Sequence, residues 1–225
     1  MAKQLEKITR KPKREPLSRE RIVDASLILI EQDGLDDFSI RKLAQALKCE
    51  AMSLYHHFPS KAHLMDALVD RVIAEAKTPD KTLEVFEQLR LVALEFRGIG
   101  LRYPQFFKYL ALHRMNTPDG IRFLTSVITI FFEAGFDAES SARLFRSFSY
   151  YLVGATLDET SGYAKGPSAV EPVSDEVIMR DYPNLAKVGV YFKPGNLEST
   201  FNWGLDMFIE GFKMAQQKLK VNPPV

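Results

Sequence analysis

The chain has 225 residues, of which 46% are hydrophobic and 26% charged, proportions that describe an ordinary soluble globular protein of one or two domains. Its single cysteine, Cys49, excludes an intrachain disulfide framework. No stretch approaches the roughly 18 consecutive apolar residues of a membrane-spanning helix, and no apolar run follows the basic N-terminus. We therefore expect a cytoplasmic protein without a signal peptide or a membrane partner.

Positive charge is concentrated at the start of the chain. Residues 1–21 carry eight Lys and Arg against three Glu, whereas residues 22–80 carry six basic and ten acidic residues. Because Pro12 and Pro16 interrupt the basic start and few apolar residues lie there, we predict that residues 1–17 form a flexible arm. Such an arm can follow a phosphate backbone or enter a minor groove, or it can be a solubilising tail.

A first helix is predicted directly after this arm. Ser18 can cap its start, and apolar residues recur on one face until Asp33-Gly34 ends the pattern. Ser39 can cap a second helix, with Phe38 and Leu43 packed across its start as a hydrophobic staple.

The second helix stops at Lys48-Cys49-Glu50, and a third of about two turns follows over residues 51–57. Helices this short are marginal in water unless they pack on neighbours. Two helices joined by a three-residue turn are typical of a helix-turn-helix, whose second helix presents its first residues to base edges.

These residues carry a resemblance. The run RKLAQALKCEAMSLYHHFPSKAHLMDAL, with its L-Y-x-H-F-x-x-K motif, resembles the DNA-binding domain of the tetracycline-repressor (TetR) family, and the likeness spans residues 22–76. It implies a base or phosphate contact at the start of the second helix, base contacts at the start of the third, and phosphate contacts at the end of the third and the start of the fourth. The residues in these positions are Arg41; Ala51, Met52 and Ser53; Tyr55, His56 and His57; and Lys61.

Two positions depart from the family pattern. Lys48 occupies a turn position that the family usually fills with glycine, so we expect it to be left-handed at a cost of roughly 1 kcal/mol. Ala51 and Met52 offer no hydrogen bonds, so they could recognise a base only through apolar contact, for instance with a thymine methyl group. Because His56 and His57 diverge by about 100° around a helix, we expect no metal site there and no cofactor.

A fourth helix is predicted from Ser60 to about Ala76, with Leu64 and Leu68 on its inward face. Thr78-Pro79-Asp80 then marks a domain boundary. We thus divide the chain into an arm (1–17), a helix-turn-helix domain (18–77), and a ligand-binding and dimerisation domain (80–225). The resemblance implies that the fourth helix links the two domains and sets the position of the recognition helix.

Of the 25 aromatic residues, 22 follow residue 80. The segments 102–116, 123–132 and 144–154 are apolar almost all round, which is typical of central helices in a bundle. A cavity between them would be lined by aromatic rings and sulfur, with a few polar groups to orient a ligand. Our candidates for contact with an unknown small-molecule effector, each of which could instead be an ordinary core residue, are Phe107, His113, Asn116, Phe148 and Tyr151.

Two long helices are predicted from Asp137 to about Tyr163 and from Asn196 to about Leu219. Glycines inside them suggest close backbone approach, and a repeat of three and four residues in the last helix predicts a helix-packing seam. The resemblance implies that both helices pair with their mates across a two-fold axis, giving a homodimer that reads a palindromic operator. The predicted interface comprises Gly154, Phe201, Gly204, Phe208, Gly211 and Ala215.

Together these patterns predict an all-α protein, in which an N-terminal three-helix helix-turn-helix domain is joined by a linking helix to a C-terminal helical bundle that dimerises. We interpret it as a transcriptional repressor that binds double-stranded operator DNA and is released by a small, largely hydrophobic effector. The alternative is a DNA-binding regulator without an effector, controlled by a protein partner or acting as an activator. A hollow of about 300 Å³ or more would favour ligand control, and a filled core would favour the alternative.

An enzyme is not expected, since the chain has no glycine-rich phosphate cradle, G-x-S-x-G, H-E-x-x-H or paired-cysteine motif. The resemblance places Lys77 and Tyr150 where members that bind tetracycline have ligand-binding and metal-ligating histidines. This difference argues against magnesium-tetracycline as the effector.

Overall fold

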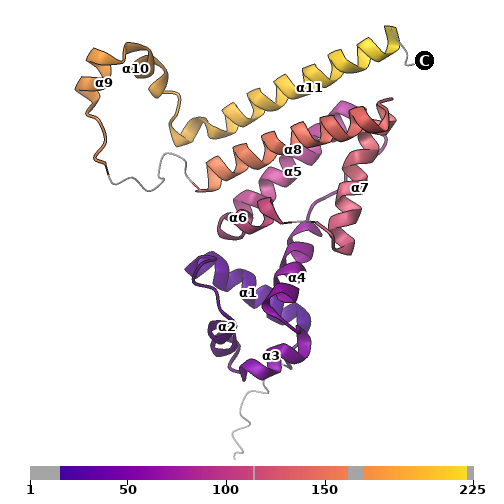
Figure 1. The fold of residues 1–225 in the computed structure, drawn as a ribbon, viewed down its shortest axis with the longest axis vertical. Coiled ribbons are helices and arrows are strands. Elements are labelled where there is room, and N and C mark those ends of the chain that lie inside the picture. Colours follow the sequence, from indigo (N-terminus) through magenta and orange to yellow (C-terminus); the bar gives the residue numbers. More distant parts are fainter. Residues whose placement is uncertain (1–15, 114, 162–169, 222–225) are drawn as a thin grey trace, which may run out of the picture.

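The computed structural model describes residues 16–113, 115–161 and 170–221, and the secondary structure of these ranges is entirely helical (Figure 1). The basic arm predicted for residues 1–17 therefore lies almost wholly outside the described residues. The predicted all-α class is confirmed. None of the described helices is both long enough and apolar enough to cross a membrane.

Four helices form the N-terminal unit: α1 (Arg19–Asp33), α2 (Ile40–Leu47), α3 (Ala51–His57) and α4 (Lys61–Ile73). Serine caps begin three of them; Ser18 and Ser39 were predicted as caps, and Ser60, predicted as the first residue of its helix, is the cap before it. The hydroxyls of Ser18, Ser39 and Ser60 accept hydrogen bonds from backbone N–H groups three residues later, at 3.2, 3.2 and 3.4 Å. Apolar residues from all four helices then share one core, which includes Ile22, Ile30, Leu43, Leu54 and Leu68.

Five helices build the bundle: α5 (Val85–Arg102), α6 (Pro104–Leu112), α7 (Pro118–Glu133), α8 (Ala138–Ser161) and α11 (Leu197–Val221). Helix α5 packs against the other four, and α8 and α11 run side by side along one edge of the bundle (Figure 1). The core is rich in phenylalanine, and Phe131, Phe148 and Phe212 make edge-on ring contacts between α7, α8 and α11.

Between α8 and α11 the chain forms an excursion of small helices: α9 (Asp175–Asp181), α10 (Pro183–Gly189) and the 3₁₀ helix η2 (Pro194–Asn196). It lies to one side of the bundle in Figure 1, and none of its helical residues is buried. Large apolar side chains such as Met179, Tyr182, Tyr191 and Phe192 are consequently exposed.

Several sequence-based boundaries need correction. Helix α4 ends at Ile73, three residues before the predicted end, because the chain tightens into a turn in which the N–H of Ala76 bonds to the carbonyl of Ile73. Helix α8 is described to Ser161, so its predicted end near Tyr163 lies outside the described residues. Helix α11 begins at Leu197, one residue after the predicted start.

The expectation that three segments are buried all round is also wrong. Each carries an exposed apolar residue: Leu112 at the end of α6, Phe132 on α7 and Tyr150 on α8. These helices enclose a core on one face only, and their other faces remain accessible in the isolated chain.

Candidate nucleic-acid interface and ligand cavity

Helix α3 lies at the end of the molecule farthest from α11 (Figure 1). Leu54 and the following Phe58 are buried and fix one side of the helix on the core. On the other side Met52 is 67% and Tyr55 41% exposed. The helix can therefore enter a groove without losing its own support.

The remaining residues of the predicted interface are distributed around this tip. Arg41 on α2 and His56 are exposed, whereas Ala51, Ser53 and His57 are half-buried. The three residues expected to contact bases, Ala51, Met52 and Ser53, are thus the first residues of α3.

The turn between α2 and α3 has the predicted backbone. Lys48 adopts φ 55° and ψ 43°, which makes it the one non-glycine residue with positive φ among those described. Its N–H donates to the carbonyl of Gln45, and the next N–H, of Cys49, donates to that of Ala44. These bonds end α2 and set the direction in which α3 leaves.

Two cations support the segments around α3. Arg19 on α1 donates to the carbonyl of His57 and lies 4.2 Å from the centre of the Phe58 ring. Lys61 at the start of α4 is exposed and donates to the carbonyl of Phe38 at 3.0 Å, which leaves two of its three N–H groups for a phosphate. Sequence reasoning missed the role of Arg19 because the contact joins residues 38 positions apart.

The N-terminal unit is attached to the bundle through two carboxylates that cap bundle helices. Both oxygens of Glu31 on α1 accept from the first turn of α6, at 3.1 Å from Gln105 N and 2.9 Å from Phe106 N. Asp70 on α4 accepts from Asp119 N in the first turn of α7 at 2.9 Å. A carboxylate at a helix N-terminus satisfies free N–H groups and interacts favourably with the helix dipole.

A third attachment centres on Glu75, just after α4. Its carboxylate accepts from the Tyr103 hydroxyl at 2.7 Å and pairs with Arg102 at 3.2 Å, and Arg71 lies beside it. Burial alone would raise the pKa of Glu75, but hydrogen bonds from Tyr103 and Arg71 outweigh it and the pKa is lowered. Burial, together with the bond to Glu75, raises the pKa of Tyr103.

Inside the bundle, α5 and α8 pack closely at Gly100. A Cβ added at Gly100 would lie 2.2 Å from Thr156 Cγ2, so no larger residue fits there without a shift. Nearby, Arg97 and Glu159 form a two-point ion pair at 2.8 and 2.7 Å with little solvent access. The bonds to Glu159 raise the pKa of the Arg97 guanidinium.

A cavity of about 310 Å³ lies among α5, α6, α7 and α8. Its walls are mainly aromatic and aliphatic. The lining residues are Val92, Phe96, Leu110, Ala111, His113, Met115, Phe123, Leu124, Val127, Phe145, Arg146, Phe148, Ser149, Leu152 and Val153.

Of the five residues predicted for a ligand site, His113 and Phe148 line this cavity and three do not. Asn116 is exposed, and the lining position in its loop belongs to Met115. Phe107 is fully buried against Phe96 and the α5–α8 contact. Tyr151 points to α11, where its hydroxyl donates to the carbonyl of Phe201.

His113 connects the cavity with the N-terminal unit. Its Nε2 lies 3.1 Å from Oδ1 of Asp66 on α4, and its ring stacks on Tyr109 at 4.9 Å. The two groups are not aligned for a hydrogen bond, so the buried Nε2 has no hydrogen-bond partner among the described residues.

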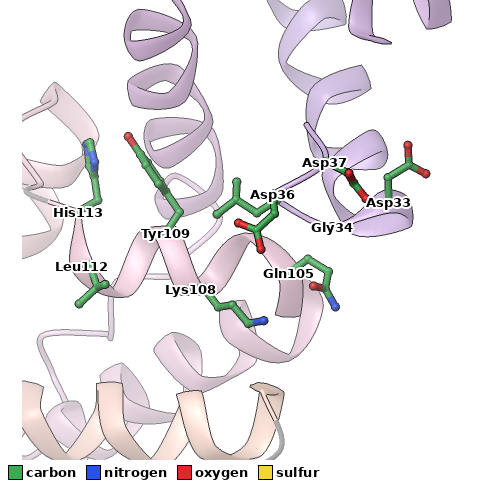
Figure 2. Close-up of a pocket in the computed structure, with 10 residues that line it drawn as sticks. Asp33, Gly34, Asp36, Asp37, Gln105, Lys108, Tyr109, Leu112 and His113 are labelled. Carbon is green, nitrogen blue, oxygen red and sulfur yellow. The ribbon is translucent and has the colours of Figure 1, made fainter. Parts of the chain in front are cut away.

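Tyr109 and His113 also border a separate pocket of about 480 Å³ between α6 and the α1–α2 loop (Figure 2). Figure 2 shows both rings on the same side of α6, while Lys108 extends toward the acidic loop that contains Asp36 and Asp37. His113 therefore lines both the 310 Å³ cavity and the 480 Å³ pocket, and it also lies beside Asp66 on α4.

The predicted interface seam on α11 divides into two groups. Phe201 is buried, Phe208 contacts the Tyr151 ring at 4.9 Å, and a Cβ at Gly204 would lie 2.6 Å from the Tyr151 hydroxyl. This group, with the half-buried Ala215, packs within its own chain, and its place in an intersubunit seam stays a prediction.

The second group leaves room for a partner. A Cβ at Gly154 or Gly211 would meet nothing within 4 Å. Along the same outer side of α11, Trp203, Met207 and Met214 are exposed at spacings of four and seven residues. Gly211 of the predicted seam thus lies beside this exposed apolar stripe, and the two together form the outer side of α11.

Residues 22–68 match the model of bacterial regulatory proteins of the tetR family, and residues 77–215 match the tetracyclin repressor-like C-terminal domain. A curated relative, the class D tetracycline repressor protein of Escherichia coli, is 30% identical over 208 residues, covering 88% of this chain and 90% of the relative.

Two solved structures have the same fold. One is a possible TetR family transcriptional regulator from Streptomyces coelicolor, with 26% identity, a TM-score of 0.73, and coverage of 88% of this chain and 100% of the other. The second is a variant of TetR from Acinetobacter baumannii in complex with minocycline, with 26% identity, a TM-score of 0.67, and coverage of 89% and 99%. With both domains matched by family models, the chain belongs to the TetR family of bacterial DNA-binding transcriptional regulators.

Proposed function

We propose that this chain is a transcriptional repressor that binds a palindromic operator as a homodimer and is released by a small, largely hydrophobic effector. The observation that carries the proposal is the placement of α4. This helix follows the recognition helix α3 after a three-residue break, and it contacts the wall of the 310 Å³ cavity through Asp66 and His113.

In this proposal α3 enters the major groove with its exposed face. Ala51, Met52 and Ser53 meet base edges, and the apolar pair favours thymine methyl groups. Arg41, Tyr55, His56 and His57 hold the phosphate backbone. Lys61 can join them with the N–H groups that its bond to the Phe38 carbonyl leaves free.

Release follows from the attachments between the two halves. Glu31, Asp70 and Glu75 bind α1 and α4 to the first turns of α6 and α7 and to the end of α5, so a shift of those helices moves α3. The free energy available for this shift is the difference between the effector's affinities for the displaced and the DNA-binding arrangements of the helices. A cavity of this size favours such control over regulation without an effector.

The relative in complex with minocycline supports control by a small molecule. The chemistry need not be the same, because neither Lys77 nor Tyr150 is among the described residues that line the cavity. Magnesium-tetracycline is therefore not the effector that we propose.

The function can be tested with the full-length chain and a library of random double-stranded DNA. We expect selection of palindromes whose half-sites are about one helical turn apart, near 34 Å. Met52→Ala should change the preferred bases, while Met179→Ala, which alters a methionine with similar exposure outside α3, should not. Recovery of no common sequence would contradict the proposal.

A further inference from the structure

The cavity has a marked charge asymmetry. Only three of its fifteen described lining residues are polar, namely His113, Arg146 and Ser149, and none is acidic. The Ser149 hydroxyl already donates to the carbonyl of Phe145 at 2.8 Å. The groups left for a ligand are therefore one guanidinium and one imidazole.

Arg146 is the fixed charge of this lining. Its side chain is exposed and its guanidinium lies 5.9 Å from the centre of the Tyr150 ring. No carboxylate within the described ranges of the chain lies within 4 Å of it, in contrast to Arg143 one turn earlier, which pairs with Glu139. A guanidinium without a counterion at the edge of an apolar cavity attracts an anion and repels a cation.

The second group, the buried His113 Nε2, lacks a hydrogen bond within the described residues although Asp66 lies 3.1 Å away. A buried polar atom in this state costs free energy that a well-placed ligand atom can recover. The ring stacks on Tyr109, which fixes its orientation, and because Nε2 is covered, a ligand atom reaches it through a shift of the neighbouring side chains.

We propose that the cavity selects an aromatic compound that carries one anionic group. Its ring system packs between Phe96, Phe123 and Phe148, and its anionic group lies against Arg146 and His113. This inference rests on the proposed control by an effector and specifies the effector's chemical class.

The same geometry gives the effector a means of acting on α4. A negative atom at His113 competes with the Asp66 carboxylate for the imidazole and repels that carboxylate. The contact between the cavity wall and α4 is then weakened, whereas a neutral compound of the same shape fills the cavity without this competition.

Two fluorescent probes of matched shape test the proposal on the full-length protein. 1-Anilinonaphthalene-8-sulfonate has one anionic group, and N-phenyl-1-naphthylamine has the same aromatic body without it. We expect the anionic probe to bind at least about fivefold more tightly, the ratio that roughly 1 kcal/mol of partly exposed ion pairing would give. Equal binding of both probes would overturn the inference and leave effector control in place.

Three variants locate the effect. Arg146→Gln and His113→Phe should each weaken the anionic probe several-fold without weakening the neutral one, and Arg143→Gln, which removes a charge on the same helix outside the lining, should change neither. A fourth variant, Ala111→Trp, should fill the cavity and abolish binding of both probes.

The controls separate the possible failures. If Ala111→Trp still binds the anionic probe, the probe lies on another surface and the inference is wrong. If neither probe binds the wild-type protein, both the inference and the effector-controlled part of the proposed function are contradicted. Operator selection is measured separately and does not depend on either probe.

Discussion

Lys48 holds the most constrained backbone position of the helix-turn-helix. An L-residue in the left-handed region brings its β-carbon close to the following carbonyl, and the Lys48 side chain makes no hydrogen bond or ion pair within the described residues to offset this crowding. Its side chain is exposed, so the residue contributes to the turn mainly through its backbone.

Lys48→Gly should therefore stabilise the protein, by up to about 1 kcal/mol, because glycine adopts this conformation without a steric cost. Gln45→Gly, at an exposed position inside α2, should instead destabilise it by about 1 kcal/mol. Urea unfolding midpoints of the two variants measure the contrast. If Lys48→Gly loses stability as Gln45→Gly does, the turn is not strained.

Among the helices, the N-terminal turns of α6 and α7 have the same arrangement. Each begins with proline, at Pro104 and Pro118, which places a residue without an N–H at the first position and leaves the following N–H groups free. A carboxylate from the N-terminal unit then accepts from those groups. The two halves of the protein are thus joined by helix capping as well as by apolar packing.

Removing one of these caps should separate the two halves partially. We expect Glu31→Ala to lower the free energy of unfolding by about 1–2 kcal/mol, since it leaves two N–H groups without an acceptor. Hydrogen exchange should accelerate at the amides of Gln105 and Phe106. The neighbouring exposed residue provides the control: Gln32→Ala should alter neither quantity, and equal effects of both changes would refute the capping role.

The contacts of Glu75 predict a dependence on pH. Its pKa is lower in the folded protein than in the unfolded chain, so its contribution to stability is present above the unfolded value of about 4.3 and is lost as the pH falls through the folded value. The stability difference between wild type and Glu75→Gln should thus be largest near pH 7 and shrink below about pH 4. A difference that stays constant over this range would show that the carboxylate charge is not involved.

At the level of assembly, several large apolar side chains on α8 and α11 are exposed in the single chain. Trp203, Met207 and Met214 form a stripe on α11, and Tyr150 is exposed on the adjacent α8. Contiguous apolar surface of this kind marks an interaction site. A two-fold pairing of α8 and α11 with a second copy would bury this stripe and leave the inner residues Phe201 and Phe208 unchanged.

Charges on this stripe should produce monomers. We expect the double variant Trp203→Glu, Met207→Glu to elute as a monomer in size-exclusion chromatography with light scattering, and to bind a full operator far more weakly because one recognition helix acts alone. Ile121→Glu adds a charge at another exposed apolar position, on α7, and should remain dimeric. A wild-type protein that is monomeric at micromolar concentration would refute the homodimer.

The sequence was most informative where structure is determined locally. The caps Ser18 and Ser39, the limits of α3 and the left-handed Lys48 depend on residues within about four positions, and each was predicted correctly. The lining of the cavity depends on how whole helices rotate against one another. In the loop after α6, Met115 lines the cavity and its neighbour Asn116 does not. Tyr151 is absent from the lining because its side chain contacts α11 instead.

Contacts between distant residues had no signal in a single sequence. Glu31, Asp66 and Asp70 are acidic residues on short amphipathic helices, where acidic residues usually face solvent. Nothing near them distinguishes a carboxylate that caps another helix or faces a cavity wall. The same holds for Arg146, whose lack of a counterion within the described residues becomes visible only in three dimensions.

The caps at α6 and α7 also determine how far the sequence of the bundle can change while it stays joined to the N-terminal unit. Glu31 and Asp70 accept from backbone N–H groups, which every residue except proline possesses, so the receiving turns can vary in side chain without losing the bond. A regulatory bundle with a different ligand could thus be joined to the same helix-turn-helix if its sixth and seventh helices begin at the same places. For chimeric sensors, the junction to preserve is then a pair of carboxylates together with the backbone they meet, rather than a matched set of interface side chains.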